Sequence, residues 1–520
     1  MRTAVRPPRD AGAGAALAPL ALGPVALLTA AVCAVLLVLG ARSGYTGGEL
    51  TVLAAGRHLS WGYADRPALL PALSRLLDSA TGGATIGARL PGTVLTSAGV
   101  GVTALTAREF GGNRRAQVLA AAVYASSAFV LGTGYVLSAT TVDAFLWAVC
   151  GALLVRWART GDNRLLGWLG VVTAVALQTE YLILVFWAVL GVALLTVGPR
   201  ELATRPRLWV AGGCALLAAT PELVWQGQHG WPWPLSRPMI DATAVGPTTF
   251  PPLLLLAAGL FAGAAGVCYG VLRLLCCDEL RRYAFLGWTA IGVFAVFLAL
   301  GCRPYLAAGL FPVLWAAAAV EVVRHPPPRN WRWLASWPVL AVSALLALPG
   351  APGLPGWAGW PSSPLTPLAW LSRDGGSVAT AVDPRIGPRH NDAGWLLFAE
   401  TVAQAYRGLP PESRRNVVIV TKGMWGAAAL ERFGQHLDLP PVYCAQRDYG
   451  FFGEPTEDAT GVLYVGDPAA IRPYFDELRL VGSVPEVAPG ATAFPSGTPL
   501  WLAQHRNTPW ALLWPALRHS

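Results

Sequence analysis

Long runs of apolar residues recur along the first two-thirds of the chain, separated by short polar turns. Each run is close to the roughly 20 residues that a helix needs to cross a hydrocarbon core of about 30 Å. We therefore predict about eleven spanning helices, over 18–40, 89–106, 115–133, 141–157, 164–178, 181–197, 208–225, 251–272, 283–301, 304–322 and 333–350. The first run is longer than the apolar region of a signal peptide, about 7–15 residues, and is predicted to stay as a helix.

The basic residues between the runs alternate from turn to turn. Every second short turn carries arginines, and the turns near 134–140, 179–180 and 302–303 carry almost none. Because cytoplasmic loops are enriched in Lys and Arg, this predicts a cytoplasmic N-terminus and an extracytoplasmic C-terminal region. The long loops 42–88 and 226–250 then face outward, in a transmembrane domain over residues 1–350.

The pattern changes after residue 350. A Pro/Gly-rich connection over 351–372 breaks regular structure. Beyond it a helix over 391–406, a strand over 416–420, a helix over 426–437 and a strand over 461–465 alternate. This alternation predicts a small extracytoplasmic α/β domain over 373–520.

Composition agrees with a polytopic α-helical membrane protein. Hydrophobic residues make up 54% of the chain and charged residues 13%, against roughly 25% charged in soluble proteins; the mean hydropathy is +0.47. The net charge of +9 resides largely in the turns, which excludes nucleic acid as the expected partner. The eight cysteines show no Cys/His spacing of a metal site, and no metal site is predicted.

Ionisable residues gather at helix ends on the predicted outer face. Such residues at membrane depth are costly and usually line a cavity, so they are functional candidates. Structural interpretations remain open for three of them: Asp143 as a favourable charge in the first turn of a helix, Glu222 as the mark of a kink beside Pro221, and His229 as an interfacial residue. The candidates are Glu49, Arg57, His58, Tyr63, Asp65, Asp143, Glu180, Glu222, His229, Arg303 and Tyr305.

The first outer loop contains two amphipathic segments. In residues 49–61 the apolar side chains Leu50, Leu53, Ala54 and Leu59 share one helical face. We expect this face to lie in the membrane interface with Arg57 and His58 near lipid headgroups. Residues 67–77 repeat the pattern, and two such helices beside a carboxylate are typical of an enzyme with a lipid substrate.

Four segments of the sequence, in order, carry a resemblance to a known family. They are Glu49–Leu69, with Gly56-Arg-His-Leu-Ser-Trp-Gly-Tyr-Ala-Asp-Arg-Pro67; Leu137-Ser-Ala-Thr-Thr-Val-Asp143; Trp225-Gln-Gly-Gln-His-Gly-Trp-Pro232; and Arg303-Pro-Tyr-Leu-Ala307. With the tail segment Leu439-Pro-Pro-Val-Tyr443, they resemble the GT-C membrane glycosyltransferases of family 39. That group includes protein O-mannosyltransferases and the aminoarabinose transferases of lipid A, and the likeness is to its actinobacterial type.

The resemblance implies transfer of a sugar from a polyprenyl-phosphate donor to a glycan, lipid or protein acceptor at the outer face of the cell membrane. A carboxylate acts as general base in an inverting reaction. Glu49, Asp65 and Asp143 are the catalytic candidates, and Arg303, Arg57 and the histidines are the candidates beside the leaving phosphate. No cofactor is implied, and a divalent metal has no support in the residue spacing.

The chain departs from the family pattern within the implied donor pocket. The first loop of the family has an Asp–Glu pair, and here Gly48 replaces the Asp. Glu180 stands where a Lys is usual, Arg66 where Gln is usual, and Glu222 where Asn is common. Three interpretations stay open: Glu49 is the base, Asp65 or Asp143 has taken the role, or the protein is an inactive homologue that acts in binding or assembly. A transporter is the weakest alternative, since no repeated halves are found.

Overall fold

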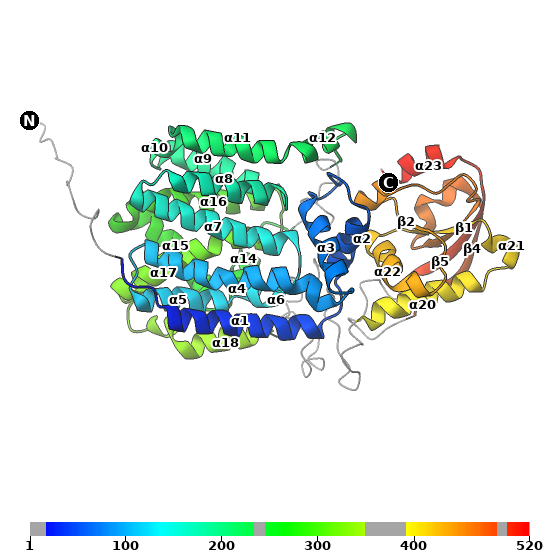
Figure 1. The fold of residues 1–520 in the computed structure, drawn as a ribbon. Helices are drawn as coiled ribbons and strands as arrows, with labels where there is room; N and C mark the ends of the chain where they lie inside the picture. Colours follow the sequence, from blue (N-terminus) through cyan, green and yellow to red (C-terminus); the bar gives the residue numbers. More distant parts are fainter. Residues whose placement is uncertain (1–16, 233–244, 349–391, 486–496, 519–520) are drawn as a thin grey trace, which may run out of the picture.

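The computed structural model describes residues 17–232, 245–348, 392–485 and 497–518. It consists of a bundle of roughly parallel and antiparallel helices, a C-terminal α/β region, and two helices, α2 (Gly47–Arg57) and α3 (Leu69–Ala80), that lie between them (Figure 1). The proposed connection over 351–372 lies outside the described residues.

All eleven apolar runs are mainly helical, and they form the bundle. Five helices among the described residues are long and apolar enough to cross a membrane, or up to seven if each bent pair counts as one span. The number of eleven spans therefore stays a prediction. The bundle helices are α1 (Leu22–Arg42), α4 (Thr85–Glu109), α5 (Arg114–Ala125), α6 (Ala128–Thr133), α7 (Ala139–Thr160), α8 (Arg164–Leu177), α9 (Ile183–Thr196), α10 (Arg200–Ala203), α11 (Pro206–Ala218), α12 (Thr220–Gln228), α14 (Phe250–Ala258), α15 (Ala262–Cys276), α16 (Ala284–Ala299), α17 (Phe311–Arg324) and α18 (Trp337–Ala347), with 3₁₀ helices η1 (Asp278–Tyr283), η2 (Pro304–Leu310) and η3 (Arg332–Ala335).

Two runs that we predicted as continuous helices are bent. The run over 251–272 turns by 108° between α14 and α15. Gly259 stands at this break with φ 129°, a conformation that only glycine adopts readily. The run over 208–225 bends by 48° between α11 and α12, where Pro221 lies in the first turn of α12 and its ring cannot continue the preceding helix.

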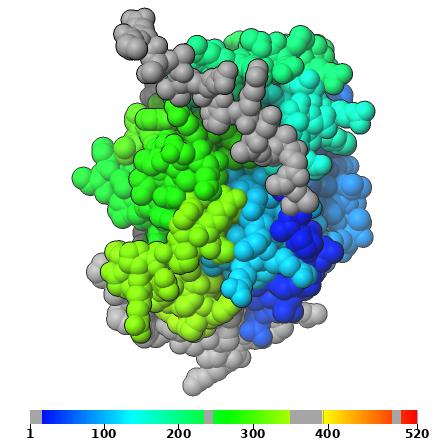
Figure 2. All heavy atoms as spheres, turned by 90° about the vertical axis from the view of Figure 1, so that its left-hand side faces the viewer, coloured from blue at the N-terminus to red at the C-terminus, as the bar shows by residue number. Residues whose placement is uncertain are grey.

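The arginine-rich turns lie together at the end of the bundle far from the C-terminal region. Two ion pairs join different turns at this end: Arg159 at the end of α7 pairs with Glu109 at the end of α4 at 2.6 Å, and Arg324 at the end of α17 pairs with Glu279 in η1 at 3.0 Å. Figure 2 looks onto this end. The predicted asymmetry of basic residues is thus also an asymmetry of the folded bundle; that this end is cytoplasmic remains a prediction.

The C-terminal region contains a five-stranded sheet in the order β2-β1-β3-β5-β4. The parallel strands β1 and β3 and the helices α20 and α22 occur near their predicted positions. The antiparallel strands β5 and β4 were not predicted, since β4 is an edge strand that is mostly exposed and rich in charge. The elements are α20 (Ala393–Arg407), α21 (Pro411–Arg414), β1 (Val417–Thr421), α22 (Met424–Phe433), η6 (Gly434–His436), β2 (Val442–Tyr443), η7 (Arg447–Phe451), β3 (Gly461–Val465), η8 (Pro468–Ala470), η9 (Arg472–Tyr474), β4 (Phe475–Ser483), β5 (Pro499–Arg506) and α23 (Trp510–Arg518).

The apolar face of α2 does not lie in the membrane interface, and our prediction for it was wrong. Leu50, Leu53 and Ala54 are buried in one hydrophobic core with residues of α20 and α22, and Leu59 is 54% exposed. At Gly47 a Cβ atom would lie 2.7 Å from the Trp425 ring, so glycine lets α22 approach α2 closely. Burial against a folded region replaces burial in lipid, and the amphipathic pattern alone does not distinguish the two.

Candidate functional site

Three of the predicted carboxylates converge at the bundle end that faces the C-terminal region. Asp143 lies in the first turns of α7, Glu180 in the turn between α8 and α9, and Asp65 in the loop that joins α2 to α3. Glu180 is close enough to Asp143, Asp65 and Arg66 to interact with each electrostatically. The structure therefore brings together residues from three separate parts of the sequence.

A fourth carboxylate, Asp448 from η7, reaches this cluster from the C-terminal region. The Arg66 Nε atom lies 2.9 Å from Asp65 Oδ1 and 2.8 Å from Asp448 Oδ2. The Asp65 amide donates to Asp448 Oδ1 at 3.0 Å, and Arg447 lies 3.5 Å from Asp65. Asp65, Arg66 and Asp448 thus form a buried ion-pair network that ties the first outer loop to the C-terminal region.

The electrostatics of this network are unequal. Burial opposes ionisation of Asp65, yet the adjacent Arg66 guanidinium dominates and lowers the pKa of Asp65 well below its usual range. Burial and the neighbouring Asp65 charge raise the pKa of Asp448. Sequence reasoning missed Asp448 and Arg447, since 383 positions separate Asp448 from Asp65 and no pattern in the tail singled them out.

The environment of Glu180 favours the protonated form of its carboxyl group. Burial is the main cause that raises the pKa of Glu180 to about 7. The ideal pKa of a general acid or base lies near the working pH, so this carboxyl is able to exchange a proton at neutral pH.

Replacement of Glu180 by glutamine is expected to stabilise the protein at alkaline pH. A carboxyl that ionises near pH 4.3 when unfolded and near 7 when folded costs stability as the pH rises between these two values, because the unfolded state loses its proton first. Glu180→Gln removes this cost, on the order of 1–3 kcal/mol at pH 8 and nearly none at pH 4. Thermal unfolding in detergent across this pH range measures it, with exposed Glu412→Gln as control; parallel curves for wild type and Glu180→Gln would contradict the expectation.

Glu222 belongs to a second, adjoining group. The Tyr181 hydroxyl donates to Glu222 Oε1 at 2.7 Å, and the Gln226 amide donates to the same oxygen at 3.2 Å and to the Tyr63 carbonyl at 2.8 Å. Glu222 Oε2 is buried and has no hydrogen-bond partner among the described residues. Glu222 is therefore part of a polar network at the α12 kink.

The Tyr63 hydroxyl holds the loop together. It donates to the Ala55 carbonyl at 3.0 Å and accepts from the Ser60 amide at 3.1 Å. These bonds close the turn that follows α2 and place Asp65 beside the cluster.

Glu49 is engaged in a structural network. Its Oε1 accepts from Arg89 Nε and its Oε2 from Arg89 Nη2, both at 2.7 Å. With Thr46 it also forms a capping box at the start of α2. Arg89 further donates to the carbonyls of residues 40, 43 and 44, so Glu49 is 3% exposed and is the counter-ion of a buried guanidinium.

Asp143 differs from Glu49 and Asp65 in having an unused oxygen. It is 4% exposed, and its Oδ1 has no hydrogen-bond partner among the described residues. The N-cap of α7 is Ser138, whose side chain accepts from the Thr141 amide. Capping therefore does not occupy Asp143. A buried polar atom without a partner needs an explanation, and a substrate group that binds at this oxygen would supply one.

The predicted basic residues Arg57, His58 and His229 contact the C-terminal region. Arg57 donates to the Glu431 carbonyl at 3.0 Å. The His58 ring stacks on Phe452 at 4.6 Å, and burial lowers the pKa of His58. His229 stacks on Trp225 at 4.1 Å and lies 5.8 Å from Phe451.

Arg303 and Tyr305 lie at the start of η2, which packs on the first turns of α7. Arg303 donates to the Tyr305 hydroxyl at 3.2 Å, and Tyr305 stacks on Phe129. At Gly309 of η2 a Cβ atom would lie 2.4 Å from Trp147 Cβ. Arg303 therefore shares the bundle end that contains Asp143. Within the described part of the chain, no group of three or more His, Cys, Asp or Glu side chains is arranged to hold a metal ion.

Comparison with known proteins gives a match of part of the chain to a family model, and a similar fold. Residues 65–225 match the family model described as dolichyl-phosphate-mannose-protein mannosyltransferase. The structure resembles the crystal structure of ArnT from Cupriavidus metallidurans in the apo state, with a TM-score of 0.57 and 14% identity over 93% of this chain and 98% of that chain. For the crystal structure of the same protein bound to undecaprenyl phosphate, the TM-score is 0.57 and the identity is 15%, over 92% of this chain and 98% of that chain. The chain has no significant match among curated protein sequences.

Proposed function

We infer that this protein is a membrane glycosyltransferase. Its fold is that of the GT-C glycosyltransferases, and its residues 65–225 match the mannosyltransferase family model. It transfers a sugar from a polyprenyl-phosphate donor to an acceptor hydroxyl. The observation that carries this function is the convergence of Asp143, Glu180 and the Asp65–Arg66–Asp448 network at one end of the bundle.

The reaction is an inverting displacement. A carboxylate accepts the proton of the acceptor hydroxyl, the hydroxyl oxygen forms a bond to the sugar C1, and the bond from C1 to the phosphate oxygen breaks on the opposite face. The electron pair of that bond leaves with the polyprenyl phosphate, whose charge is stabilised by cationic side chains. The chain thus has to supply one carboxylate oxygen that can accept a proton and at least one guanidinium.

We assign the base to Asp143. Both oxygens of Glu49 are held by Arg89, and Asp65 faces Arg66 and Arg447. Asp143 alone of the three catalytic candidates has a carboxylate oxygen without a partner among the described residues. Glu180 lies near enough to Asp143 to interact with it electrostatically.

We assign to Arg303 the stabilisation of the charge on the leaving phosphate. This arginine opens η2, which packs on α7 at the end where Asp143 lies. Arg57 and His58 are engaged with the C-terminal region, so their role is to dock that region on α2. The C-terminal region then covers the site, and the predicted eleven spans with a cytoplasmic N-terminus put this region outside the membrane.

One observation favours a second candidate, a homologue that binds lipid-linked sugar without transferring it. Gly48 stands in the first turn of α2 where the family pattern has its Asp, and the neighbouring Glu49 is sequestered by Arg89. In that case the scaffold serves binding or assembly.

The turnover of polyprenyl-phosphate sugars in native membranes distinguishes the two functions. We expect wild-type membranes to consume a donor and to release polyprenyl phosphate, and Gly48→Asp to change the rate by less than about tenfold, since the base is elsewhere. An inactive wild type together with an active Gly48→Asp variant would establish the binding homologue. Membranes without the protein are the blank.

A further inference from the structure

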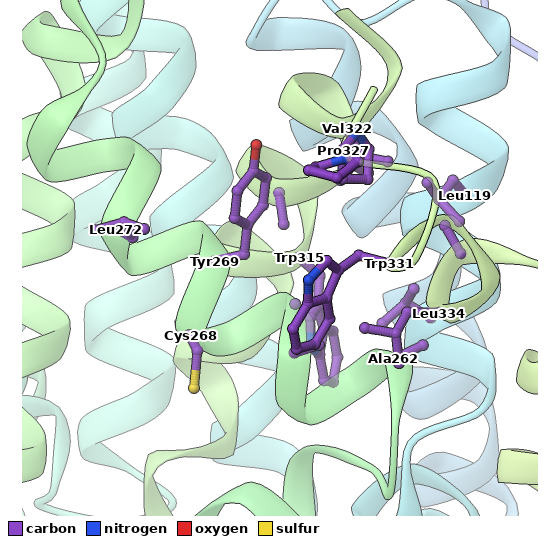
Figure 3. Close-up of a pocket in the computed structure, with 17 residues that line it drawn as sticks. Leu119, Ala262, Cys268, Tyr269, Leu272, Trp315, Val322, Pro327, Trp331 and Leu334 are labelled. Atoms are coloured by element: carbon purple, nitrogen blue, oxygen red, sulfur yellow. The ribbon is translucent and has the colours of Figure 1, made fainter. Parts of the chain in front are cut away.

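An apolar cavity of about 510 Å³ lies in the bundle away from the carboxylate cluster. It is lined by α5, α15 and α17 and is covered by the segment 327–335; Trp315 and Trp331 both face it (Figure 3). Its volume is in the range of about 300–1,000 Å³ that is usual for ligand sites. None of the predicted catalytic or substrate-binding residues lines it.

One end of the cavity carries a tyrosine hydroxyl, and two arginines contact residues that line the cavity. The Tyr269 hydroxyl points toward the side where Val322 and Pro327 lie (Figure 3), and it makes no hydrogen bond among the described residues. Arg273 lies over the Tyr269 ring at 5.9 Å, and its guanidinium pairs with Glu321. Arg332 donates to the carbonyl of Pro327, which lines the cavity, at 2.9 Å.

The covering segment has the composition of a membrane interface. Residues 324–333 read Arg-His-Pro-Pro-Pro-Arg-Asn-Trp-Arg-Trp, and Trp331 and Trp333 are 57% and 49% exposed. Trp is enriched at the level of lipid headgroups. Arg329 and Arg332 are exposed, and neither pairs with a carboxylate within the described ranges, so their charge is available to an anion.

We propose that this cavity binds one anionic glycerophospholipid from the leaflet at the arginine-rich end of the bundle. An acyl chain enters between α5, α15 and α17, and the phosphate lies between the Tyr269 hydroxyl and the guanidinium groups of Arg329 and Arg332. The occupant is anionic because Arg329 and Arg332, on the segment that covers the cavity, are exposed and pair with no carboxylate among the described residues; basic pockets between membrane helices bind such headgroups. The site is independent of the proposed sugar transfer.

The test is native mass spectrometry of the full-length protein in detergent, titrated with phosphatidylglycerol or with phosphatidylcholine of the same acyl chains. We expect one tight phosphatidylglycerol per protein and weaker binding of phosphatidylcholine. Arg329→Ala/Arg332→Ala is expected to weaken phosphatidylglycerol binding by about ten- to thirtyfold. The matched control is Arg200→Ala/Arg207→Ala, which removes two charges from the same end on α10 and α11, away from the cavity.

A second variant tests the acyl chain. Ala335 lines the cavity, and Ala335→Trp fills it without changing charge, so it is expected to remove the tight lipid. If the control variant lost as much phosphatidylglycerol affinity as Arg329→Ala/Arg332→Ala, the lipid would be attracted by overall charge and the proposed site would be wrong. Equal affinity for phosphatidylcholine and phosphatidylglycerol would also overturn it. If Ala335→Trp bound phosphatidylglycerol as tightly as wild type, the lipid would not lie in the cavity but elsewhere on the surface of the bundle, and the proposal would be wrong.

Discussion

Asp143→Asn is expected to reduce sugar transfer by about 10²–10⁴-fold, the usual contribution of a general base. The amide has nearly the same shape and takes no proton from the acceptor hydroxyl. Since Oδ1 of Asp143 has no hydrogen-bond partner among the described residues, the substitution breaks no bond at that atom. The protein is therefore expected to keep its thermal stability. Donor turnover in reconstituted membranes and the unfolding midpoint together measure the two effects.

The control for Asp143 is Asp162→Asn in the turn between α7 and α8. Asp162 is exposed, and among the described residues its side chain accepts a hydrogen bond from the Arg164 amide alone, so turnover is expected to stay near wild type. If Asp143→Asn kept wild-type turnover, the base would lie elsewhere, and Glu180 would be the next carboxylate to replace.

The second large effect is expected in stability, at Glu49. Glu49→Gln leaves the Arg89 guanidinium buried without its counter-ion, and loss of one partner of a buried pair costs about 3–5 kcal/mol. Arg89 is 1% exposed and donates to three backbone carbonyls at and just after the end of α1 as well as to Glu49. Its displacement would therefore loosen the start of α2. Thermal unfolding in detergent is expected to show a large decrease in the midpoint together with any loss of turnover.

Glu201→Gln is the matched control for Glu49. Glu201 pairs with Arg205 at 3.6 Å on the surface and is 80% exposed, and exposed pairs contribute about 0–1 kcal/mol. A Glu49→Gln protein that is as stable as wild type but inactive would show that Glu49 acts in the chemistry and would contradict its structural assignment.

The bundle was largely predictable because its signals are local. A run of about 20 apolar residues specifies a buried or lipid-facing helix wherever it occurs, and α1, α4 and α7 lie close to their expected limits. The sharp turn at Gly259 was missed, because its conformation depends on the packing of α14 and α15, whereas a kink beside Pro221 was one of the open interpretations of Glu222. The β4–β5 hairpin was missed because an exposed edge strand lacks a strong alternating pattern.

The candidate site was predictable in its members and not in its pairings. Asp65, Asp143 and Glu180 were singled out as carboxylates at helix ends, and the fold brings them together. That Glu49 is bound by Arg89, 40 residues away, is a fact of packing. The same holds for Asp448, which approaches Arg66 because the C-terminal region rests on α2.

By itself, the sequence determined the apolar helices, the arginine-rich end of the bundle and the positions of the ionisable residues, since each depends on neighbours within a few turns. Only the tertiary structure decided which of the three catalytic candidates has a carboxylate oxygen without a partner among the described residues. It also placed Leu50 and Leu53 in a core with the C-terminal region. The physical reason is that the environment of a charge, like the burial of an apolar face, is set by whichever distant segment packs against it.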